Sequence, residues 1–108
     1  MPDLDPPYEL LDMPEGQPVT FRVIRWERGD VKIQPRAAPT LKTITAVRMW
    51  VPSEDKPMGA PYWDATAGNL IARLLPMLDM LVATQRHIRV TKHGSPPFAR
   101  HQVDVLQT

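Results

Sequence analysis

Basic side chains alternate with aromatic rings in two stretches of the chain. Residues 17–50 carry seven Lys or Arg against two acidic residues, and residues 86–101 carry four Lys or Arg and no acidic residue. Lysine and arginine can pair with phosphates, and flat rings can stack on unpaired bases at about 1–3 kcal/mol per base. This mixture is typical of a surface that binds single-stranded nucleic acid. The candidate binding residues are Arg22, Arg25, Trp26, Arg28, Lys32, Lys42, Arg48, Trp50, Arg89, Lys92, Phe98 and Arg100.

Each of these residues also has a purely structural interpretation. Large rings dominate small cores, so Trp26 and Trp50 also fit a buried role, and any single cation fits a solvated outer face. In a strand, Arg48 and Trp50 would share one face and Met49 would lie on the other, but parity does not tell which face is buried. The charge blocks favour binding, because the two basic stretches carry +9 while residues 1–16 and 51–85 together carry −7.

The first sixteen residues form a segment of different character. They hold five acidic residues, four prolines and no Lys or Arg. We expect an extended acidic arm at residues 1–16, followed by a single domain at residues 17–108. Its carboxylates could remain solvated, bind the basic site of a partner protein, mimic a nucleic acid, or fold back on the basic surface. We hypothesise that the arm competes with nucleic acid, so that deletion of residues 1–14 tightens binding.

The sequence contains no recognised motif for metal binding or catalysis. His87, His93 and His101 lie near one another in the sequence, but their spacing matches no metal motif. The sequence contains no phosphate-binding glycine loop, no nucleophile-elbow serine and no zinc-binding helix motif. It also contains no cysteine, which excludes disulfides and thiolate catalysis. We therefore expect no enzymatic activity, no metal and no other cofactor.

Length and composition are those of one small globular domain. The chain has 108 residues, of which 43% are hydrophobic and 23% charged. No apolar run approaches the roughly 20 residues that cross a bilayer, and the acidic N-terminus does not resemble a signal peptide. Together with the absence of cysteine, this predicts a cytoplasmic protein with no membrane partner.

The periodicity of the hydrophobic residues predicts five strands and one helical region. Alternation indicates strands at residues 17–27, 31–34, 41–51, 87–92 and 98–106, with a turn at residues 28–30 that makes the first two a hairpin. Leucines at helical spacing follow Trp63, with Asp64 or Thr66 as the expected N-cap and Tyr62 and Trp63 as a hydrophobic staple. Pro76 should interrupt this helix.

The order β-β-β-α-β-β predicts a mainly β fold with one helical region, in the α+β class. Five short strands tend to close into an antiparallel barrel, which the helix can plug. In this order the chain resembles the OB-fold over residues 17–106, and the basic turn and strand at residues 90–103 resemble the closing hairpin of its single-strand binders. The acidic arm and the proline in the helix depart from that family. An open α+β sheet with the helix on one face is the alternative.

The resemblance and the charge pattern lead to the same functional expectation. The protein would bind single-stranded nucleic acid, DNA favoured over RNA, with little sequence specificity. A basic groove would hold the phosphates, and Trp26, Trp50 or Phe98 would stack on bases. The alternative is a structural or adaptor subunit of a larger assembly, such as a viral one. In that case the strands would form an edge between copies, and the arm would dock on a partner protein.

Overall fold

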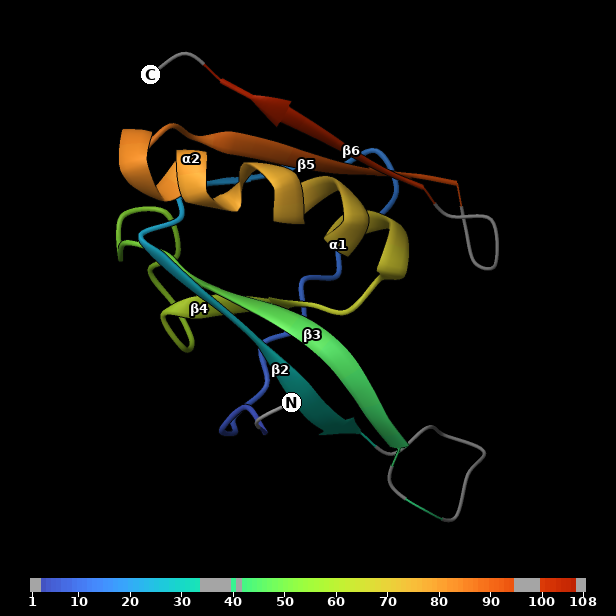
Figure 1. Ribbon diagram of the computed structural model, residues 1–108. Helices are drawn as coiled ribbons and strands as arrows, with labels where there is room; N and C mark the ends of the chain where they lie inside the picture. The colour runs from blue at the N-terminus through green and yellow to red at the C-terminus, as the bar shows by residue number, and fades with distance from the viewer. Residues whose placement is uncertain (1–2, 34–39, 41, 95–99, 107–108) are drawn as a thin grey trace.

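Six antiparallel strands and one helical segment make up the α+β fold of the computed structural model (Figure 1). The structure describes residues 3–33, 40, 42–94 and 100–106. In chain order the elements are β1 (Val19–Phe21), β2 (Arg25–Ile33), β3 (Lys42–Trp50), β4 (Tyr62–Ala65), α1 (Gly68–Leu74), a 3₁₀ turn (Leu75–Met77), α2 (Leu78–Thr84), β5 (Ile88–His93) and β6 (Arg100–Val105).

The strands form two three-stranded sheets, ordered β1-β5-β6 and β2-β3-β4. Residues 22–24 connect β1 to β2, so one nearly continuous run of chain passes from the first sheet into the second. The amide of Ile24 donates to the carbonyl of Trp50, which holds this connection against β3. The helical segment lies between the two sheets (Figure 1).

The main core lies where the helical segment meets the inner faces of both sheets. The helix contributes apolar side chains at helical spacing, and each sheet contributes alternate residues, as expected for amphipathic elements. Its fully buried members include Phe21, Val23, Val47, Met49, Leu70, Leu74, Leu78, Leu81, Ile88 and Val90. The predicted leucine stripe is therefore confirmed.

The helical segment is interrupted at the predicted place. Pro76 lies in the short 3₁₀ turn that separates α1 from α2. Proline has no N–H for the helical ladder and its ring crowds the preceding turn, so the tighter turn replaces one α-helical turn. The predicted N-cap is wrong: Ala67 occupies that position, without a side-chain cap.

Two other local predictions are also wrong. Arg28, Gly29 and Asp30 lie inside β2, opposite Val47, Ala46 and Thr45 of β3, so there is no turn at these residues. The observed hairpin joins β2 to β3. Tyr62 and Trp63 belong to β4, a strand that the sequence did not predict, and they do not staple the helix. Six strands thus replace the expected five.

The N-terminal arm crosses the face of the β2-β3-β4 sheet that points away from the helix. At the β2 edge, the amide of Leu4 donates to the carbonyl of Asp30. At the β4 edge, Leu11 donates to the carbonyl of Asp64, whose own amide donates to Glu9. Leu4 packs with Val31 and Ala46 in a second small core, and Leu11 and Met13 join the main core. The arm is thus an integral layer of the fold.

The expected closed barrel is not present in the described part of the chain. Its closure requires pairing between β4 and β6, and these strands belong to different sheets. The physical reason lies at the free edge of β4, where the arm takes both backbone hydrogen bonds of Asp64. Within the described residues, no helix is long and apolar enough to cross a membrane.

Candidate nucleic-acid interface

A cation and two aromatic rings meet on the arm-facing side of the β2-β3-β4 sheet. The register places Arg25 opposite Trp50, and Trp50 opposite Tyr62. The guanidinium carbon of Arg25 lies 3.9 Å from the centre of the Trp50 ring. The rings of Trp50 and Tyr62 are 5.8 Å apart and tilted by 59°. The side chain of Arg25 is 66% exposed, so this stack, here called the Arg25–Trp50 platform, opens to solvent.

Arg48 lies in the next row of the same face and is not available to a ligand. Its Nε and Nη2 lie 2.7 and 3.2 Å from the two carboxylate oxygens of Asp64. The side chains of Arg48 and Asp64 are 4% and 0% exposed. Burial alone would lower the pKa of Arg48, but the hydrogen bonds and charge of Asp64 raise it above its ordinary value. The placement of Arg48 on an open basic surface is therefore wrong.

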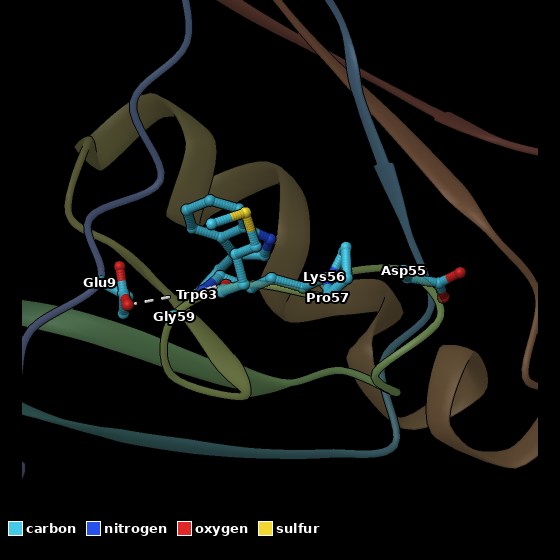
Figure 2. Close-up of a pocket in the computed structure, with 7 residues that line it drawn as sticks. Glu9, Asp55, Lys56, Pro57, Gly59 and Trp63 are labelled. Atoms are coloured by element: carbon cyan, nitrogen blue, oxygen red, sulfur yellow. Dashed lines mark hydrogen bonds and ion pairs between the residues drawn. The ribbon is translucent and has the colours of Figure 1, made fainter.

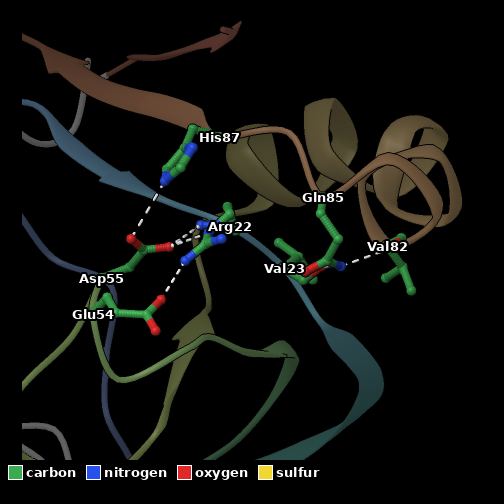
Figure 3. Close-up of polar contacts among 7 residues, drawn as sticks. All are labelled: Arg22, Val23, Glu54, Asp55, Val82, Gln85 and His87. Atoms are coloured by element: carbon green, nitrogen blue, oxygen red, sulfur yellow. Dashed lines mark hydrogen bonds and ion pairs between the residues drawn. The ribbon is translucent and has the colours of Figure 1, made fainter. Parts of the chain in front are cut away.

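Arg22 is also occupied by carboxylates of its own chain (Figure 3). Its backbone amide and its Nε both donate to Asp55, each at 3.0 Å, and its Nη2 lies 2.5 Å from Glu54. His87 contacts the other oxygen of Asp55 at 3.3 Å. These contacts join the bend between β1 and β2, the loop after β3 and the start of β5. We assign the cluster a structural role.

The arm neutralises two further predicted cations. Lys32 lies 3.5 Å from the carboxylate of Asp3, and Lys92 lies 3.3 Å from that of Asp12. The partners are far apart in the sequence, so the charge count along the chain gave no sign of the pairing. The acidic arm and the basic strands therefore offset each other in the folded chain.

Four predicted cations are exposed and form no ion pair or hydrogen bond within the described residues: Arg28, Lys42, Arg89 and Arg100. They do not share one surface. Arg28 lies on the helix-facing side of β2, and strand parity places Lys42 on the arm-facing side of β3. Arg89 and Arg100 lie on the outer face of the β1-β5-β6 sheet. The cations that were predicted to line one groove therefore lie on two different sheets.

The remaining aromatic candidates differ in their surroundings. Trp26 points towards the helix, packs against the main core, and donates from Nε1 to Asp79 at 3.1 Å. It is half-buried and does not belong to the Arg25–Trp50 platform. Phe98 lies outside the residues that the structure describes.

Arg28 lines a pocket that the sequence did not indicate. Its volume is about 530 Å³, and it lies between the β2-β3 hairpin and the start of the helical segment. Two hydroxyl groups, from Thr45 and Thr66, line it beside the apolar side chains of Ile71 and Leu75. A pocket with one cation, two hydroxyls and apolar walls fits a sugar or a base better than a metal ion.

A second pocket, of about 510 Å³, lies beside the loop before β4 (Figure 2). Its charged groups are already engaged, whereas Nε1 of Trp63, which also lines the pocket, is buried and has no hydrogen-bond partner among the described residues. Lys56 Nζ donates to the carbonyls of Met58 and Ala60 at 3.0 and 2.6 Å, and it lies 3.5 Å from Glu9. The amide of Ala60 donates to Glu9, and this bond lowers the pKa of Glu9 despite partial desolvation. These contacts build the loop and leave no charge free for a ligand.

Gly59 explains why that loop can close so tightly. Its φ is +78°, and a Cβ at this position would lie 2.5 Å from Glu9 Oε1 and 2.9 Å from Lys56 Nζ. The backbone angle therefore favours glycine, and a larger residue would also displace the ends of the Glu9 and Lys56 side chains.

The histidines do not form a metal site in the described part of the chain. His101 is buried, and its Nδ1 lies 2.7 Å from Oδ1 of Asn69. His93 contacts Gln102 and His87 contacts Asp55. No three potential ligands gather among the described residues.

Comparison with known proteins adds no functional assignment. No protein-family model, curated protein or solved structure matches the chain.

Proposed function

We propose that the protein binds single-stranded nucleic acid, DNA favoured over RNA, with little sequence specificity and without enzymatic activity. The contact surface is the β2-β3 ribbon, which comprises residues 25–33 and 42–50. The observation that supports this most directly is the Arg25–Trp50 platform, where an exposed guanidinium covers a half-buried indole ring. Lys42 adds a second exposed cation on the same face of β3, whereas Arg28 lies on the opposite face of the ribbon.

The platform offers two ways to hold an unpaired base. A base can stack on the guanidinium plane of Arg25, or it can replace that plane on the Trp50 ring while Arg25 turns to a phosphate. From Trp50 to Lys42 the strand extends about 27 Å, because each strand residue adds about 3.4 Å. The arm covers this face between the two residues, where Ala46 and Arg48 are buried, so the stacking contact is confined to the Trp50 end of the ribbon.

The architecture supports the same proposal. We propose that the two sheets are the halves of an opened OB-like barrel, in which the bend between β1 and β2 joins them at one side. The pairing that a closed barrel would add is between β4 and β6. In OB-folds the ligand lies across the second and third strands, which correspond here to β3 and β4. Trp50 and Tyr62 lie on that face.

The experiment is a titration of a labelled oligothymidylate, with binding followed by fluorescence anisotropy at salt concentrations from about 50 to 200 mM. We expect affinity to fall steeply with salt, since cations that neutralise phosphates release bound counterions. Replacement of Trp50 by Leu should weaken binding by about 1–3 kcal/mol. The Arg25→Ala variant tests the same platform without altering a buried residue.

The matched control is Arg73→Ala. Arg73 is exposed on α1 and forms no ion pair within the described residues, so this variant also removes one positive charge. It should bind as the wild type does, whereas Lys42→Ala should bind more weakly at every salt concentration. Equal effects of the two substitutions would show that only net charge matters. No binding at low salt would overturn the proposal.

A further inference from the structure

The outer edge of β6 forms no backbone bridge to any other segment in the described part of the chain. β6 pairs with β5 on one side only. On the other sheet, the arm contacts the edge of β2 at Asp30 and the edge of β4 at Asp64. β1, the other edge of the same sheet as β6, has only three residues. The arm thus bridges the edges of β2 and β4 at one residue each, and nothing among the described residues bridges the outer edge of β6.

The backbone groups at this edge can be identified from one hydrogen bond. The amide of Leu106 donates to the carbonyl of His87 on β5 at 2.8 Å. In an antiparallel pair such bonds alternate along the strand, so Gln102 and Asp104 also direct their backbone groups towards β5. His101, Val103 and Val105 therefore direct their N–H and C=O groups towards the open edge, where another strand can bind them.

The side chains of β6 are complementary to a second, antiparallel copy of the same strand. Arg100, Gln102 and Asp104 share its exposed face, with Gln102 midway between the two charges. A two-fold axis through Gln102 places Arg100 opposite Asp104 of the other copy, twice by symmetry. It also places His101 opposite Val103, and both direct their backbone groups outwards, so the two residues exchange hydrogen bonds.

The nearest alternative register is less favourable. An axis through Val103 would also align the free backbone groups, but it places Asp104 opposite Gln102 and leaves Arg100 opposite Leu106. Opposite charges that face each other across a strand pair stabilise it, and like charges destabilise it. The sequence of β6 therefore favours the axis at Gln102.

From this edge and its charge pattern we infer that two copies of the chain associate through antiparallel pairing of β6 with β6. The product is one continuous six-stranded sheet shared between two subunits. Val103, Val105 and Leu106, which are half-buried in the single chain, lose further exposed area in this pairing. This association does not depend on nucleic-acid binding, which we place on the other sheet.

The test is sedimentation velocity over a concentration series, which separates the 12.3 kDa chain from its dimer. Arg100→Asp and Asp104→Arg each set like charges opposite each other twice, so each should raise the dimer dissociation constant by about tenfold or more. The double variant restores opposite charges and should recover the dimer. An equimolar mixture of the two single variants should form a heterodimer for the same reason.

Two further variants complete the design. Val103→Pro removes an N–H that faces the open edge and leaves the pairing with β5 intact, so it should yield a monomer. Lys42→Asp makes the same charge change on the other sheet and should leave the dimer unchanged. Circular dichroism verifies that each variant is folded. A wild-type chain that stays monomeric, or a dimer that Arg100→Asp does not weaken, would overturn the inference.

Discussion

Arg48 and Asp64 form a buried ion pair with two contacts, at 2.7 and 3.2 Å, between neighbouring strands and beneath the N-terminal arm. The pair connects three layers of the structure. The Arg48 guanidinium lies 3.9 Å from the Tyr62 ring centre, and the Tyr62 hydroxyl donates to the carbonyl of Pro7 in the arm. Asp64 also accepts a hydrogen bond from the amide of Glu9. An arginine predicted to bind a ligand instead holds the arm on the sheet.

Removing one member of this pair should destabilise the folded chain much more than removing both members. Arg48→Met leaves the Asp64 carboxylate buried without its counter-charge, so we expect a loss of about 3–5 kcal/mol in the free energy of unfolding. The double variant Arg48→Met/Asp64→Leu should lose less, although the Glu9 amide then lacks its acceptor. Urea denaturation measures both. A loss below about 1 kcal/mol in Arg48→Met would contradict a structural role for the pair.

Neutralising one arm carboxylate should strengthen nucleic-acid binding. Asp3→Asn frees Lys32 on the β2-β3 ribbon, so the affinity for oligothymidylate should rise and the slope of its log–log salt dependence should steepen by about 0.7. Glu15→Gln is the control, because Glu15 lies in the same arm but contacts the amide of Gly94. If both variants behave alike, the effect is one of net charge only.

Deletion of residues 1–14 is unsuitable as a test of the arm, although the charge pattern of the sequence led to it. It would remove Leu4, Leu11 and Met13, all of which are buried. Any change in binding would then be confounded by unfolding of the sheet that the arm covers.

His101 should make stability depend on pH below its ordinary pKa of 6.5. Burial lowers the pKa of His101, the nearby charge of Lys92 lowers it further, and Asp12 partly opposes this. The unfolded chain therefore takes up a proton near the ordinary value of 6.5, while the folded chain resists it. Stability should accordingly fall as the pH drops through that value towards the folded pKa. His101→Gln should show a smaller fall in urea midpoint, and an equal fall would contradict this origin.

Asp55 should contribute to the pH dependence of stability at a lower pH than His101 does. Burial alone would raise the pKa of Asp55, but hydrogen bonds from Arg22 and His87 outweigh it and hold the pKa below the ordinary value of 3.8. Its stabilising contribution is thus complete above that pH and is lost as the pH falls towards the folded pKa. Asp55→Asn should flatten the acid limb of a stability profile measured below about pH 4. An unchanged limb would exclude Asp55 as its source.

The elements with regular periodicity could be predicted from the sequence, and those held by distant contacts could not. Alternation in Lys42–Trp50 and leucines at helical spacing led to β3 and to the interrupted helix, because each buries one face. β4 has no such pattern, since Tyr62, Asp64 and Ala65 are all buried. Gly29 and Asp30 are common in turns, but their pairing with β3 and the contact of Asp30 with the arm keep them extended.

The sequence also indicated only part of the candidate site, because contacts between residues far apart in the sequence could not be predicted. Arg25 and Trp50 were both named from residue type, and strand register brings them together. The neutralised cations could not be recognised, because their partners lie far away: Arg48 and Asp64 are 16 residues apart, and Lys92 and Asp12 are 80 apart. Counting charges along the chain does not show which charges meet after folding.

The most direct test of the account is the position of the nucleic acid on the folded protein. In ¹⁵N-labelled protein, the three tryptophans give separate indole N–H signals by NMR, and each backbone amide reports on its own strand. On addition of oligothymidylate at low salt, we predict that the indole signal of Trp50 and the amides of β2 and β3 shift and saturate together, while the indole of Trp63 does not. Shifts confined to β5 and β6, or no shifts at all, would contradict binding at the Arg25–Trp50 platform.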